Sequence, residues 1–120
     1  ANSMTIRGEG SAQTSIQQGL CKHWTRVTSG DTVADSFNQS SITDNSASDC
    51  TYNINNDMAS ANYSNSFLAT YDSNTNPFRT LGYFGSLPTA SAFRTHGFYD
   101  TTTATNDMAI STVATFGDLS

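Results

Sequence analysis

The segment that constrains the fold most is Cys50–Asn55, whose side chains alternate strictly in character. One set is apolar or aromatic (Cys50, Tyr52, Ile54), and the other is polar (Thr51, Asn53, Asn55). A side-chain period of two places one set in a core and the other in solvent, so this segment is predicted to be a β-strand. The polar run Thr43–Asp49 before it is rich in Asn, Asp and Ser, which favour turns. We therefore expect a β-hairpin whose first strand contains Val33 and Phe37 and whose turn is Thr43–Asp49.

The remainder of the chain repeats this pattern of short strands and turns. About seven short strands with turn residues roughly every ten positions are typical of an antiparallel β-sandwich, jelly-roll-like, or of a small barrel. The chain has 120 residues, which is the size of one domain. Residues 20–120 are predicted to form this all-β domain, with Cys21 and Val27 facing its core and Trp24 covering a rim or an interface.

Residues 1–19 are expected to form an N-terminal extended segment that ends in a short helical turn. Thr14 or Ser15 would cap that turn, which places Ile16 and Leu20 on one face. A helix this short is unstable alone, so it needs a surface to dock on, and a partner subunit would provide one. Ile16, Leu20 and Trp24 are therefore the candidate subunit contacts.

Composition excludes several classes of function. The net charge is −5 and only five residues are Lys or Arg, scattered along the chain, so no basic stripe exists to bind nucleic acid. No apolar run approaches the ~20 residues of a membrane-spanning helix, so membrane insertion is not expected. Cys21 and Cys50 do not form a CxxC motif, and they are interpreted as core residues, with a disulfide between them as the alternative.

The sequence contains no recognisable catalytic or metal-binding motif. Glu9 is the only glutamate, and the aspartates fall mostly at predicted turns, so no carboxylate pair of the glycosidase type is indicated. His23 and His96 belong to neither an HxH nor an HExxH pattern. We predict a protein that is not an enzyme and that needs no cofactor and no metal, although a histidine on a three-fold axis could bind one.

The best candidates for ligand binding follow the predicted strand Asn65–Tyr71. Aromatic rings and planar polar groups occur together there, as sugar-binding sites require. The candidate receptor- or glycan-binding residues are Tyr71, Asp72, Asn74, Asn76, Phe78, Arg79 and Tyr83, with Phe84 beside them. The competing interpretation is that Tyr71, Tyr83 and Phe84 belong to the core or to a subunit interface.

Four segments in a fixed order carry a family resemblance. These are Gln17–Trp24, Asp35–Asn38, Ser41–Asn45 and Met58–Tyr63. Together they resemble the C-terminal domain of tail-fibre and other virion structural proteins of marine and cyanobacterial tailed bacteriophages. That family usually reads SFN-x-SS-[IL]-TDNGTGDYT-x-NF, followed by A-M-x-x-ANY. This chain departs from the pattern at Ser46–Ser48, where the family has Gly-Thr-Gly, and at Cys50, where it has Tyr.

The resemblance implies a place on a virion more directly than it implies a ligand. It implies a homotrimeric tail-fibre domain on the virion surface, made in the bacterial host cytoplasm, that contacts other virion proteins and a host cell-surface glycan or protein. A trimer would also protect the exposed strand edges of a β-domain with so few charges. The alternatives are a capsid, collar or head-fibre decoration protein with structural contacts alone, and a surface-polysaccharide depolymerase.

Overall fold

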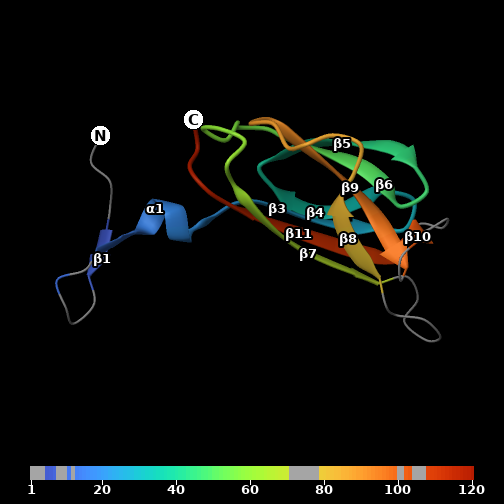
Figure 1. The fold of residues 1–120 in the computed structure, drawn as a ribbon, viewed down its shortest axis with the longest axis horizontal. Helices are drawn as coiled ribbons and strands as arrows, with labels where there is room; N and C mark the ends of the chain where they lie inside the picture. Colours follow the sequence, from blue (N-terminus) through green and yellow to red (C-terminus); the bar gives the residue numbers. More distant parts are fainter. Residues whose placement is uncertain (1–4, 8–10, 12, 71–78, 100–101, 104–107) are drawn as a thin grey trace.

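The computed structural model describes residues 5–7, 11, 13–70, 79–99, 102–103 and 108–120. These residues form an all-β protein in which two antiparallel sheets pack face to face, as Figure 1 shows. The predicted fold class is therefore confirmed as a β-sandwich. The two sheets remain separate in the described part of the chain, so the barrel alternative does not apply.

One sheet has four strands in the order β4-β3-β11-β7. Its strands are β3 (Cys21–Thr28), β4 (Thr32–Phe37), β7 (Ser64–Thr70) and β11 (Ile110–Phe116). Alternate residues of β11 are buried, namely Ser111, Val113 and Thr115, so one face of this sheet lies against the core and the other faces outward.

The second sheet has five strands, in the order β10-β9-β6-β5 with β8 also paired to β9. Its strands are β5 (Gln39–Ser46), β6 (Asp49–Ile54), β8 (Thr80–Tyr83), β9 (Ala92–Tyr99) and β10 (Thr102–Thr103). Strands β6 and β9 lie at its centre, with the register Tyr52↔Phe93 and Thr51↔Arg94.

The core lies between the two sheets and is centred on aromatic residues of the five-stranded sheet. Tyr52 and Phe93 stack with their ring centroids 5.0 Å apart, and both are almost fully buried. Phe67 of β7 reaches Phe93 from the other sheet at 6.2 Å. Cys50, Tyr52 and Ile54 all belong to this core, which confirms the predicted inward face of Cys50–Asn55.

The predicted hairpin is present, but its first strand is wrong. Strand β6 pairs with β5, whereas the segment with Val33 and Phe37 is β4 and pairs with β3 in the other sheet. The predicted turn is also wrong, because Thr43–Ser46 continue strand β5 and the reversal occurs at Ala47 and Ser48, with Ser48 at φ 60°.

Asn38 explains why the chain changes sheets between β4 and β5. Its φ is 58°, in the left-handed region that Asn tolerates better than most residues. Its side-chain amide donates to the carbonyl oxygens of Lys22 and Asn56 at 3.0 and 3.1 Å, and its Oδ1 accepts from Asn56 N at 2.7 Å. Three hydrogen bonds to the main chain thus fix a corner between the two sheets.

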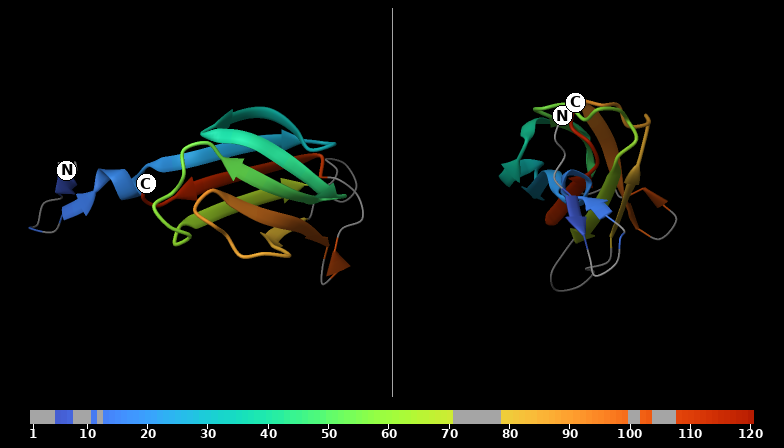
Figure 2. Two further views of the ribbon diagram at one scale, coloured as in Figure 1. Left: turned by 90° about the horizontal axis from the view of Figure 1, so that it is seen from above. Right: turned by 90° about the vertical axis from the view of Figure 1, so that its left-hand side faces the viewer.

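The N-terminal elements lie apart from the sandwich. They are β1 (Thr5–Arg7), β2 (Gln13–Ser15) and the single turn α1 (Ile16–Gly19), and the chain then enters β3 through Leu20. Strands β1 and β2 pair with each other, and α1 contacts these two strands. Figures 1 and 2 show them projecting from one end of the body along its long axis. We call the described residues from Thr5 to Leu20 the N-terminal arm.

Candidate functional site

The outer face of the five-stranded sheet is polar. Because Cys50, Tyr52 and Ile54 fill the core, their neighbours Asp49, Thr51 and Asn53 point away from it. The register sets Asp49 opposite His96, and Thr51 opposite Arg94. Strand β5 adds hydroxyl groups beside them, since Asn53 Nδ2 donates to Ser41 Oγ and Thr43 Oγ1 at 3.1 and 3.3 Å. This polar face is the candidate site.

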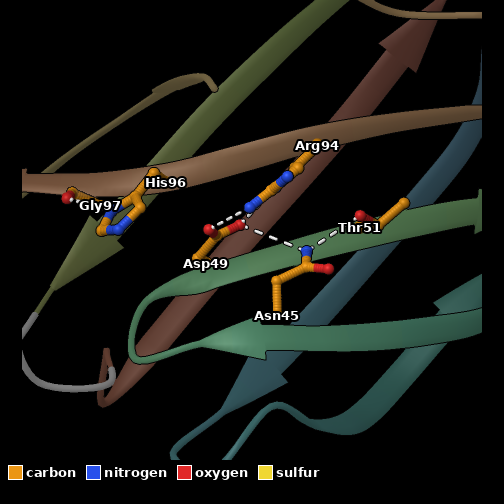
Figure 3. A network of polar contacts seen from close by, with 6 residues as sticks. All are labelled: Asn45, Asp49, Thr51, Arg94, His96 and Gly97. Atoms are coloured by element: carbon orange, nitrogen blue, oxygen red, sulfur yellow. Dashed lines mark hydrogen bonds and ion pairs between the residues drawn. The ribbon is translucent and has the colours of Figure 1, made fainter. Parts of the chain in front are cut away.

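An ion pair between Asp49 and Arg94 lies on the polar face, beside the turn that joins β5 and β6, as Figure 3 shows. Arg94 Nε donates to Asp49 Oδ1 at 2.8 Å, and a terminal nitrogen donates to Oδ2 at 2.6 Å. Asp49 is 2% exposed, whereas the Arg94 side chain is 31% exposed. The hydrogen bonds from Arg94 hold the pKa of the Asp49 carboxyl below its usual value, so the carboxylate stays charged. A two-point contact of this kind fixes the plane of the guanidinium.

Asn45 extends the ion pair toward strand β5. Its side-chain nitrogen donates to Asp49 Oδ1 at 3.2 Å and to Thr51 Oγ1 at 3.0 Å (Figure 3). On the other side of the pair, His96 is buried, and its Nδ1 lies 2.8 Å from the carbonyl oxygen of Gly97. Asn45 thus orients the Asp49 carboxylate, while His96 lies opposite Asp49 in the β6–β9 register.

Phe84 places an aromatic ring against the guanidinium. Its centroid lies 5.6 Å from Arg94 Cζ, within the range of a cation–π contact, and 4.8 Å from the ring of His96. The main chain fixes this position, because Phe84 N donates to Arg94 O at 3.2 Å. The next residue, Gly85, has φ 75°, and a β-carbon there would lie 2.7 Å from a terminal nitrogen of Arg94. The positive φ favours glycine at position 85, since it strains any residue with a side chain, whereas the flexible end of Arg94 can shift to make room for a β-carbon.

A shallow hollow of about 280 Å³ adjoins this group, lined by Tyr83, Phe84, Gly85, Ser86 and Leu87. Phe84 is 37% exposed beside it. The surface thus combines an exposed aromatic ring, a fixed planar donor and several hydroxyl and amide groups. Such a combination can bind sugars, with the ring against an apolar sugar face and the polar groups bound to hydroxyls.

The structure places two of the seven predicted binding residues. Arg79 is half-buried just before β8 and forms a β-bridge with Ala69. Tyr83 is 41% exposed, but its ring packs edge-on against Phe67 at 5.5 Å and its hydroxyl accepts from Asn65 at 3.0 Å. Tyr83 therefore lies on the inner side of β8, away from Arg94. The other predicted residues, Tyr71, Asp72, Asn74, Asn76 and Phe78, lie outside the described residues.

Sequence reasoning missed Asn45, Asp49, Arg94 and His96. The sequence places Asp49 in a predicted turn, whereas the structure shows that it begins strand β6. A signal was nevertheless present in β9, where Arg94, His96 and Phe98 alternate with small or apolar residues and so share one outward face. The link from this row to Asp49 depends on the β6–β9 register, which a single sequence does not reveal.

The candidate subunit contacts lie on the arm and at the start of β3. Ile16 is half-buried, Leu20 is 57% exposed and Trp24 is 37% exposed. Val27, in contrast, is buried, as expected from the alternation of β3.

His23 is part of the core. Its two ring nitrogens lie 3.1 Å from Thr115 Oγ1 and 2.5 Å from Gln39 Oε1, and its ring meets Phe93 edge-on at 5.7 Å. Burial lowers the pKa of His23 below its usual value. Among the residues that the structure describes, no cluster of three metal-ligating side chains occurs.

Both cysteines are free thiols. Cys50 is buried in the core, whereas Cys21 is half-buried. No helix in the described ranges has the length and apolar character needed to cross a membrane.

Comparisons with protein-family models, with curated proteins and with solved structures found no match to this chain.

Proposed function

We propose that this chain is a receptor-binding domain of a phage tail fibre or related virion appendage, which attaches to a glycan on the host cell surface. The observation that supports this most is the group of Phe84, Arg94 and Asp49 on the outer face of the five-stranded sheet. The resemblance to tail-fibre domains is a second, independent support. Under this proposal the domain is a homotrimer on the virion surface, and it binds without catalysing a reaction.

The charge of the polar face favours a neutral ligand. Arg94 is paired with Asp49, so this part of the face carries no net charge. The protein as a whole carries a charge of −5, which repels an acidic polysaccharide. Hydroxyl-rich neutral sugars match the remaining groups, such as Thr51, Asn53 and Ser41, which donate and accept hydrogen bonds without charge.

A second candidate function is a capsid, collar or head-fibre decoration protein that contacts other virion proteins alone. The observation in its favour is the apolar outer face of the four-stranded sheet, which exposes Trp24, Phe37 and Leu68. A location at the shell or neck of the particle would favour this alternative, whereas a location at the distal end of a fibre would favour attachment.

The proposed function is tested by binding of the full chain to an array of neutral and acidic bacterial surface polysaccharides. We expect binding to a neutral polysaccharide that Phe84→Ala weakens about three- to tenfold, the range for one aromatic contact. Leu119→Ala is the control, because Leu119 is an apolar residue with the same 37% exposure as Phe84 and lies at the C-terminal bridge to Met58, outside the polar face. Circular dichroism of each variant establishes that the fold is retained.

Three outcomes would contradict the proposal in different ways. Binding that is equally lost in both variants would place the site elsewhere. Loss of binding on substitution of Asp72, Asn74 and Arg79 by Ala, with binding by Phe84→Ala unchanged, would assign the site to residues 72–79. Turnover of a bound polysaccharide by the isolated chain would identify a depolymerase.

A further inference from the structure

The outer face of the four-stranded sheet differs sharply from the polar face. Its outward residues form rows across the strands in the order β4, β3, β11, β7. One row is Phe37, Trp24, Ala114 and Ser66, and the next is Asp35, Arg26, Thr112 and Leu68. Trp24, Phe37 and Leu68 are 37%, 54% and 73% exposed, and a group of exposed large apolar side chains on one face is typical of an interaction site. The formal charges of Arg26 and Asp35 cancel, so no net charge on these rows keeps another protein away.

The shape of this face follows from the sizes of its side chains. Strand β11 carries the small residues Thr112 and Ala114 between the larger Trp24 of β3 and Leu68 of β7. A trough of about 430 Å³ results, and it continues past Leu68 toward Ile110 as a second hollow of about 250 Å³. Trp24 and Phe37, paired across β3 and β4, form a ridge beside the trough. One face therefore carries both a ridge and a trough, the complementarity that contact between identical copies requires.

The extent of the face indicates what else the contact contains. Four strands ~4.8 Å apart and seven residues rising ~3.4 Å each give a flat area of roughly 450 Å². A stable interface buries ~800 Å² on each partner, so the sheet face supplies about half of it. The N-terminal arm joins this face at Leu20, which is 57% exposed, and it packs on itself rather than on the body. An isolated two-stranded hairpin is marginal in water, so the arm also needs a surface.

We infer that a second copy of this chain covers the outer face of the four-stranded sheet, with its Trp24–Phe37 ridge in the trough over Thr112 and Ala114. The arm of the neighbouring copy adds the remaining contact area. Mutual exchange of ridge and trough between two copies gives a dimer, whereas a trimer requires the ridge and the trough of each copy to contact different neighbours. The inference deepens the assembly part of the proposed function and does not depend on glycan binding.

The test uses the full chain and its single tryptophan, Trp24, which lies on the ridge itself. Light scattering gives the mass, and Trp24 emission is followed on dilution. We expect an oligomer at high concentration whose emission shifts to the red as it dissociates, because Trp24 then meets water. Leu68→Lys should raise the dissociation constant at least tenfold, since it places a charge in the trough. Leu87→Lys is the matched control, because Leu87 is 82% exposed on the loop after β8 and should leave assembly unchanged.

The results that would overturn the inference are specific. A wild-type chain that is monomeric at high concentration, with emission independent of dilution, excludes the contact even if Leu68→Lys fails to fold. An oligomer that Leu68→Lys leaves intact, with unchanged emission, assembles through another surface. A dimer that Leu68→Lys dissociates supports this contact and refutes the three-fold part of the proposed function. If a variant remains an intact oligomer but no longer binds the polysaccharide, the result concerns the proposed glycan-binding function and not this subunit contact.

Discussion

Replacing Phe93 by Ala tests whether the two sheets share one core. Phe93 is 1% exposed, and it contacts Tyr52, His23, Tyr63 and Phe67 with ring centroids at 5.0, 5.7, 6.2 and 6.2 Å. Burial of a phenylalanine side chain removes ~150 Å² of apolar surface from water, which stabilises the folded state by ~4 kcal/mol at ~25 cal/mol per Å². Measured losses for Phe→Ala in cores are ~3–5 kcal/mol. Because rings from both sheets meet at Phe93, we expect Phe93→Ala to lower the free energy of unfolding by about 4 kcal/mol. This is a large part of the ~5–15 kcal/mol that stabilises a typical domain.

Urea unfolding followed by circular dichroism measures this loss, and thermal unfolding should show a fall in Tm of ~12–20 °C for a domain of this size. Phe37→Ala is the control, measured where the chain is monomeric. Phe37 is 54% exposed, so its loss should cost less than ~1 kcal/mol. A loss below ~1.5 kcal/mol for Phe93→Ala would refute the reasoning, since it would mean that the two sheets do not enclose Phe93.

Two further predictions concern buried titratable groups. Burial lowers the pKa of His23 in the folded chain, so the unfolded chain binds the additional proton below its ordinary pKa of ~6.5. The contribution of neutral His23 to the free energy of unfolding should therefore be fully present above pH ~6.5. It should fall as the pH drops below that value, by at most ~1.4 kcal/mol per pH unit. Unfolding at pH 7.5 and 5.5 measures the effect, and a His23→Gln variant that keeps the same pH slope would contradict the assignment. Burial also raises the pKa of Cys50 to about 12, so this thiol should be inert to a thiol reagent in the folded chain. We expect Cys21 alone to react in native protein and both thiols in urea, whereas no reaction in urea without reductant would indicate a disulfide.

The strand alternation in the sequence predicted the architecture better than it predicted which strands pair. Cys50, Tyr52 and Ile54 alternate strictly, and all three lie in the core. The partner of their strand was misassigned because Asn38 bends the chain between sheets, and a single Asn among many does not reveal a positive φ. The composition of Thr43–Ser46 predicts a turn, yet these residues belong to strand β5 because Ile42 faces Tyr52 and fixes the register.

The candidate site was less predictable, since it is made by neighbouring strands and not by one segment. Asp49 and Arg94 lie 45 positions apart in the chain and meet through the β6–β9 pairing. Tyr83 and Phe84 are adjacent in sequence, but strand alternation sends Tyr83 toward Phe67 and Phe84 toward Arg94. Aromatic and polar composition indicated the region around β8, whereas the polar partners came from β5, β6 and β9.

The central claim is that the polar face binds a glycan through Phe84 and Arg94, and mapping the bound ligand by nuclear magnetic resonance tests it most directly. The side-chain Nε–H signal of Arg94 and the main-chain signals of β5, β6, β8 and β9 are followed as the polysaccharide that binds on the array is added. The proposal predicts saturable shifts at Arg94, Phe84, Asn45 and Thr51, with the strands of the four-stranded sheet unchanged. Shifts confined to the four-stranded sheet or to residues 71–79, with Arg94 unaffected, would contradict it.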